Sequence, residues 1–136
     1  MNSRITGLVL NLEPNQIFVF GSNEAGRHGR GAAKQAMSFG AKYGVGEGLA
    51  GHTYGIPTKD AKIQTLPIRK IKPYVDRFIE FAKTNHQYTF LVTEIGCGLA
   101  GYVPNQIAPL FIEAVRVNNI HMPKSFWDIL NRQNNG

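Results

Sequence analysis

The sequence predicts an α/β domain, a three-layer α/β/α arrangement in which helices cover both faces of a mixed, mostly parallel sheet. Two short apolar runs, residues 17–20 and 88–95, each end in a glycine-rich loop that leads into a helical pattern. A long amphipathic pattern lies between them, at residues 72–84. Strands that alternate with helices in this way are typical of α/β proteins.

The first half of the chain is expected to carry two strands and one helix. Residues 17–20 are a short β-branched and aromatic run between turn residues, which predicts a fully buried strand. Residues 21–31 then form a loop, and small side chains at helical spacing predict a helix over residues 31–43. The glycine-rich residues 44–51 are expected to be flexible, and residues 52–57 predict a second strand.

The middle of the chain contains the strongest helical pattern. Residues 63–68 are ambiguous, because Pro67 argues against a central strand. Residues 72–84 predict an amphipathic helix, because apolar side chains recur on one face opposite charged ones. Residues 88–95 predict another strand, which runs into a glycine loop at residues 96–102.

The last part of the chain is expected to be mostly helical. Pro104 follows the second glycine loop, and proline is favourable at the first position of a helix. After a short apolar segment around Ile120, Ser125 is expected to cap a last helix that ends at Leu130. Residues 131–136 are expected to fray.

Composition is that of a single globular domain spanning residues 1–136, with 43% apolar and 18% charged residues. A formal net charge of +6 favours an anionic partner such as a nucleotide or nucleic acid, although modest basicity can also serve solubility alone. The single cysteine, Cys97, excludes an internal disulfide and suits a reducing compartment. No apolar stretch is long enough to span a bilayer, so we expect a cytoplasmic protein without a membrane partner.

The two glycine loops are the expected functional site. In open α/β sheets, ligands bind beyond the carboxyl ends of the strands, where both loops begin. A glycine-rich loop exposes backbone N–H groups that can hold a diphosphate, whereas each loop alone could be a tight turn that needs glycine for a positive φ. The first loop has neither the Gly-Lys-Ser/Thr ending of a Walker A motif nor the GxGxxG spacing. The histidines show no zinc-site spacing, and we expect no metal and no cofactor.

Together the loops resemble the macrodomain family, whose members bind ADP-ribose. In that family a strand ends in Asn-Ala-Ala-Asn before a glycine-rich loop and a helix, and residues 20–23 and 29–33 resemble this passage. A second family loop reads like Ser-Thr-Gly-Ile-Phe-Gly-Tyr-Pro, and residues 95–104 resemble it closely. The resemblance covers about residues 17–117 and implies a macrodomain-like fold.

The resemblance also implies roles for individual residues. Asn23 would contact the distal ribose, and Gly29 and Gly31, with Ala32, would line one side of the diphosphate. Residues 98–102 would wrap the other side, with Tyr102 packing near the distal ribose. No residue matches the family's adenine-binding aspartate. The ligand-binding residues expected from the resemblance and from the loops are Gly21, Ser22, Asn23, Arg27, His28, Gly29, Arg30, Gly31, Ala32, Gly96, Cys97, Gly98, Leu99, Ala100, Gly101 and Tyr102.

Lys59, with Asn23, is the candidate for catalysis. Hydrolytic macrodomains often carry an aspartate in the first loop, where this chain has Arg30. A subgroup, the terminal ADP-ribose protein glycohydrolases and the DNA ADP-ribosyl glycohydrolases, instead uses a lysine in a Thr-Lys pair after a strand. Thr58-Lys59 resembles that pair, and residues 95–99 resemble the subgroup's Ile-Gly-Cys-Gly-Leu loop.

A lysine in this place could act in two ways. Near a diphosphate it would bind the ligand electrostatically, and a desolvated amine could attack the ribose C1″ to form a Schiff base. A carboxylate would then be needed for proton transfer. The subgroup's aspartate falls at Ala100 in this chain, and Asp60 or Glu24 could replace it. The alternative is a solvated loop lysine.

Other side chains in the loops have equally simple alternatives. His28 could bind phosphate or be a surface histidine, and Arg27 and Arg30 could hold phosphate or a nucleic-acid backbone or be solvated. Cys97 fits better as a small residue in a tight loop than as a thiol of lowered pKa.

Three functions are consistent with these features. The first is binding of ADP-ribose or an ADP-ribosyl group, with possible hydrolysis of its linkage to a protein or nucleic acid. The second is a non-catalytic binder or sponge of a nucleotide derived from NAD. The third is a basic nucleic-acid-binding module.

Overall fold

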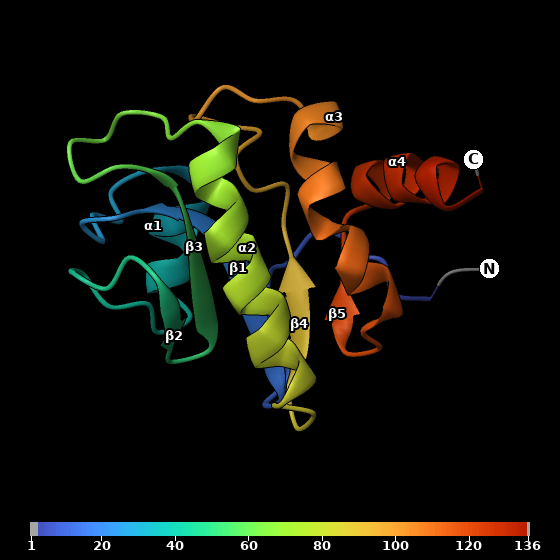
Figure 1. Cartoon of the computed structure of the whole chain (residues 1–136). Coiled ribbons are helices and arrows are strands. Elements are labelled where there is room, and N and C mark those ends of the chain that lie inside the picture. The colour runs from blue at the N-terminus through green and yellow to red at the C-terminus, as the bar shows by residue number, and fades with distance from the viewer. Residues whose placement is uncertain (1–2, 136) are drawn as a thin grey trace.

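The fold is built on a five-stranded sheet in the order β2-β3-β1-β4-β5 (Figure 1). The computed structural model describes residues 3–135, apart from the side chains of residues 134 and 135. The strands are β1 (Gln16–Asn23), β2 (Gly48–Ala50), β3 (Thr53–Lys59), β4 (Thr89–Val92) and β5 (Ile120–His121). β1 pairs in parallel with β3 and β4, β4 pairs in parallel with β5, and β2 pairs antiparallel with β3. The prediction of a mixed, mostly parallel sheet is confirmed.

Helices cover both faces of the sheet, which confirms the predicted three-layer α/β/α class (Figure 1). On one face lie α2 (Ile68–Lys83), α3 (Pro104–Ile107), the 3-10 helix η1 (Ala108–Arg116) and α4 (Lys124–Asn135). The other face carries α1 (Gly31–Met37), a helix of 7 residues.

The central strand β1 is buried on both sides, and alternate residues serve the two layers. Ile17 and Val19 belong to the large core under α2, η1 and α4, whereas Phe18 and Phe20 pack with α1. None of these four side chains is more than 1% exposed. Each contributes roughly 1.5–3 kcal/mol of burial free energy. The period of two along the strand thus fixes its place between the layers.

Two predictions for the stretch after the first loop are wrong. The residues expected to be flexible include β2, whose Gly48 pairs with Gly55 of β3. The first helix ends at Met37 instead of residue 43, because the chain turns back through Gly40 at a φ of +102°. A Cβ on Gly40 would come within 3.1 Å of the Cα of Gly51, so close packing of two backbones sets the end of this helix.

Helix α2 is confirmed and begins earlier than predicted. It starts at Ile68 after Pro67, whose extended ψ of 155° ends the preceding turn, and it tolerates Pro73 inside. The predicted apolar stripe is fully or nearly fully buried: Ile71, Val75, Phe78, Ile79 and Ala82.

The C-terminal helix differs from its prediction at both ends. It begins at Lys124, so Ser125 is not its cap; the Ser125 hydroxyl donates to Glu94 Oε2 at 2.5 Å instead. It continues past Leu130 to Asn135. The expected fraying of residues 131–136 stays a prediction, and Gly136 lies outside the described residues. Between residues 3 and 135 no helix has the length and apolar character needed to cross a membrane.

Gly46→Ala is expected to destabilise the fold by about 1–3 kcal/mol, because overpacking a close backbone approach is costly. A Cβ at this position would overlap the carbonyl oxygen of Asn23. Gly7→Ala is the matched control, since a Cβ there has nothing within 4 Å, and its effect should stay within about 0.5 kcal/mol. Urea unfolding measures both. Equal stability of the two variants would contradict this packing.

Candidate functional site

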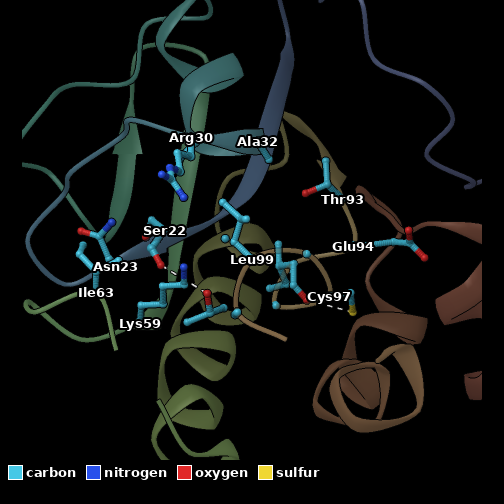
Figure 2. Close-up of a pocket in the computed structure, with 18 of the residues that line it drawn as sticks. Ser22, Asn23, Arg30, Ala32, Lys59, Ile63, Thr93, Glu94, Cys97 and Leu99 are labelled. Carbon is cyan, nitrogen blue, oxygen red and sulfur yellow. Dashed lines mark hydrogen bonds between the residues drawn. The ribbon is translucent and has the colours of Figure 1, made fainter. Parts of the chain in front are cut away.

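A pocket of about 620 Å³ lies where β1, β3 and β4 end (Figure 2). Three segments surround it: the first loop (residues 24–30), the β3 turn (residues 60–67) and the second loop (residues 93–103). Parallel pairing places Asn23 beside Lys59 at this edge of the sheet. The residues that line the pocket are Gly21, Ser22, Asn23, Arg27, Gly29, Arg30, Gly31, Ala32, Ala33, Thr58, Lys59, Ile63, Thr93, Glu94, Ile95, Gly96, Cys97, Gly98, Leu99 and Ala100.

The structure brings together most residues that the sequence placed in a ligand site, with the exception of His28, Gly101 and Tyr102. His28 is buried at 4% exposure, and its Nε2 lies 3.0 Å from the carbonyl oxygens of Lys42 and Val45. Two acceptors at one ring nitrogen require that Nε2 carries the proton. His28 therefore connects the first loop to residues 42–45 and does not line the pocket.

Tyr102 also has a structural role, because its side chain connects two segments of the chain. Its hydroxyl donates to the carbonyl oxygen of Leu66 at 2.5 Å, which joins the second loop to the β3 turn. A second bond, from Thr65 Oγ1 to the carbonyl oxygen of Ala100 at 2.9 Å, makes the same connection. The two hydrogen bonds thus join the β3 turn to the second loop.

Asn23 shapes the first loop with its side chain. Its Nδ2 donates to the carbonyl oxygen of Arg27 at 2.8 Å, and its Oδ1 accepts from the Arg27 N–H at 2.9 Å. One N–H and one lone pair of the amide stay available, because a primary amide has two of each. Asn23 can therefore hold the loop and still face a ligand hydroxyl.

The two carboxylates considered as partners of Lys59 are engaged elsewhere. Glu24 Oε2 accepts a hydrogen bond from the Tyr74 hydroxyl, and this bond is the main cause that raises the pKa of Tyr74 to about 12. Asp60 Oδ1 accepts from the backbone N–H groups of Lys62 and Gln64 at 2.8 and 3.0 Å. Neither side chain lines the pocket.

Positive charge gathers on one side of the pocket. Arg27, Arg30 and Lys59 all line it, and none of them forms an ion pair within the described part of the chain. The guanidinium of Arg30 and the amine of Lys59 point toward the same region, while Glu94 lies across Leu99 from them (Figure 2). Unpaired cations beside a concave site attract an anionic ligand.

Glycines in the two loops fall into two groups. Some are required by the fold: Gly96 has a φ of +74°, and a Cβ on Gly21 would lie 3.3 Å from the Gly96 nitrogen. Gly29 and Gly98 are different, because neither has a positive φ and a Cβ on either would meet nothing within 4 Å. Within residues 3–135 their N–H groups also have no backbone hydrogen bond.

Cys97 lines the pocket as a protonated thiol. Burial, followed by the nearby Glu94 carboxylate, raises the pKa of Cys97 to about 11. Its Sγ contacts the carbonyl oxygen of Ile95 at 3.4 Å. A thiol of raised pKa is a poor nucleophile at neutral pH, which favours the packing role expected for this residue.

Several lining residues were not anticipated as ligand-binding residues: Ala33, Thr58, Ile63, Thr93, Glu94 and Ile95. The strand predicted over residues 88–95 includes Thr93 and Glu94, but β4 ends at Val92. Both residues therefore follow the carboxyl end of a strand, where ligands bind in α/β sheets, and this position is the signal that identifies them. Ile63 had no such signal, because only the shape of the β3 turn brings it to the pocket.

Comparisons with models of protein families, with curated proteins and with solved structures found no match to this chain. The resemblance of its loops to macrodomains therefore stays a prediction. Among residues 3–135, no three histidine, cysteine, aspartate or glutamate residues gather in a way that could hold a metal ion.

Alkylation of Cys97 by iodoacetamide at pH 8 is expected to be about 100-fold slower than that of an unperturbed thiol. The reason is that a pKa raised from 9.0 to about 11 leaves about one hundredth of the thiolate. Glu94→Gln should accelerate the reaction modestly, since it removes the smaller of the two causes. Reaction of the native protein at the rate of a free thiol would contradict a half-buried, protonated thiol at this position.

Proposed function

We propose that this protein binds ADP-ribose, or an ADP-ribosyl group, in the pocket between the two glycine loops. The diphosphate would lie on backbone N–H groups of both loops, and the distal ribose would lie beside Asn23 and Lys59. A volume of about 620 Å³ is within the usual range for small-molecule sites. A cytoplasmic location would suit a protein whose single cysteine is a free thiol.

The observation that carries the proposal is the pair Gly29 and Gly98. The fold requires glycine at neither position, since both have ordinary φ angles and open space where a Cβ would point. They come from opposite loops and line the same pocket. Glycine at such places lets a ligand approach the backbone and leaves N–H groups free to bind phosphate oxygens.

Charge supports the same ligand class. Arg27, Arg30 and Lys59 line the pocket without ion-pair partners in the described chain. Charge-assisted hydrogen bonds from such groups to phosphate are stronger than neutral ones. The three basic residues are therefore placed to bind an anionic small molecule at this site.

Hydrolysis of an ADP-ribosyl linkage is the second candidate, and Lys59 is the residue that favours it. Its amine could attack C1″ of the ribose, displace the linked group and form a Schiff base with the opened sugar, which water would then hydrolyse. The displaced group must take up a proton, and Glu24 and Asp60 are both held in other hydrogen bonds. Binding without turnover is therefore the reading that this geometry supports best.

Gly29→Ala and Gly98→Ala are each expected to weaken ADP-ribose binding at least about tenfold, because a methyl group would stand between ligand and backbone. Their stability should stay unchanged or rise by about 0.4–1 kcal/mol, since glycine is not needed by the fold there. Gly7→Ala is the matched control, with open space but no place in the pocket. Calorimetry measures binding and urea unfolding measures stability.

Two results would contradict the proposal. One is unchanged ADP-ribose affinity in both loop variants. The other is no heat with ADP-ribose but salt-sensitive binding of DNA or RNA, which would indicate the nucleic-acid-binding alternative.

Lys59→Ala is expected to weaken ADP-ribose binding about tenfold, because it removes a cation from the ligand's side of the pocket. It should also abolish any release of ADP-ribose from ADP-ribosylated DNA or protein. Lys62→Ala is the matched control, because this neighbouring lysine is exposed and does not line the pocket. Absence of release by the unaltered protein would leave a binder, and equal release by Lys59→Ala would exclude Lys59 from the chemistry.

A further inference from the structure

Ile63 is an apolar residue whose side chain is partly exposed to solvent. It lies at the tip of the β3 turn, lines the pocket and keeps 39% of its surface exposed. It is absent from both buried apolar clusters and from the partly buried residues packed against them. The hydrophobic core therefore gives no reason for isoleucine at this position.

The backbone of Ile63 is also strained. Its φ of +64° is the only positive φ among the described non-glycine residues. A left-handed conformation is disfavoured for residues with a Cβ, least for asparagine and most for a β-branched residue, whereas glycine adopts it readily. Outliers of this kind persist where their surroundings impose them, and they cluster at ligand sites.

The surroundings that impose this conformation are the hydrogen bonds of the turn. The Asp60 carboxylate accepts from two N–H groups on either side of Ile63, at Lys62 and Gln64. The Asp60 N–H donates to the carbonyl oxygen of Gln64 at 2.8 Å, and the Ile63 N–H donates to that of Asp60 at 3.1 Å. The bond from Thr65 to Ala100 ties the turn to the second loop. These hydrogen bonds hold the turn, and Ile63 with it, at the pocket.

The position of Ile63 within the pocket indicates which part of a bound ligand would lie beside it. The β3 turn that carries Ile63 directly follows Lys59, which pairs with Asn23. In Figure 2, Ile63 lies on the side of the pocket that carries Asn23 and Lys59, away from Thr93 and Glu94. In the proposed binding mode this is the end of the distal ribose. A side chain here lies beside whatever group is attached to C1″ of that ribose.

We infer that Ile63 is a specificity-determining residue, which packs against a planar heteroaromatic base joined to the distal ribose. This inference rests on the proposed function. A branched aliphatic side chain has no polar group and can pack against the face of a ring. The apolar surface buried between the side chain and the ring would stabilise the complex. A flexible peptide side chain carrying the ADP-ribosyl group would cover it less well. The ligand class is therefore a ribosyl-linked base, either free, as in NAD, or within a nucleic-acid strand.

The test compares four ligands by calorimetry: ADP-ribose, NAD, an oligonucleotide with an ADP-ribosylated base, and a peptide with an ADP-ribosylated glutamate. Ile63→Gly should weaken binding of NAD, of the oligonucleotide or of both by about five- to tenfold, and change binding of ADP-ribose and of the peptide less than about twofold. Whichever of NAD and the oligonucleotide is affected identifies the source of the base. Ile63→Val, which keeps an apolar branched side chain, should retain the preference.

The same variant has a second readout that a purely structural role would not give. Ile63→Gly should raise the melting temperature by about 1–4 °C while it weakens binding, because glycine relieves the positive φ. Equal weakening of all four ligands, no weakening of any, or a lower melting temperature would overturn the inference and leave the proposed function intact. Failure of the unaltered protein to bind ADP-ribose at all would instead overturn the proposed function, and this inference with it.

Discussion

Parallel pairing of β1 with both β3 and β4 is the constraint on which the site depends. Because the three strands run in the same direction, their carboxyl ends meet at one edge, with Asn23 opposite Lys59. The Thr93 N–H and hydroxyl both donate to the carbonyl oxygen of Val19, which fixes the start of the second loop against β1. A shift of register by one residue would also exchange the side chains that β1 presents to its two buried layers. The core and the pocket are therefore set by the same pairing.

Close approach of the two loops explains why so much of this edge is glycine. The end of β1 and the start of the second loop nearly touch at Gly21 and Gly96, and a Cβ on Gly96 would lie 3.0 Å from Ile107 Cδ1. Glycine at these two positions allows the end of β1, the second loop and α3 to pack closely. Gly29 and Gly98 face open space instead. Glycine is thus required by close packing at some positions of these loops, whereas at Gly29 and Gly98 the packing does not require it.

Local pattern was sufficient for the fold class and for the position of the pocket. β1 and α2 carry clear periodicities, and a glycine loop after a strand predicts a site at its carboxyl end. What local pattern could not show were contacts made by distant residues. The buried His28 ring contacts the carbonyl oxygens of Lys42 and Val45. Strand β2 forms because it pairs with β3. Ile63 reaches the pocket through a turn in which its own φ is positive.

The most direct test of the account is a titration of the ¹⁵N-labelled protein with ADP-ribose, followed by backbone amide chemical shifts. The largest changes are expected at Gly29, Gly98 and their neighbours in the two loops, with smaller changes at Lys59 and Asn23. The amide of Gly7, which lies outside the pocket, should not move. No change, or changes centred on another surface, would contradict the claim that these two loops hold a diphosphate.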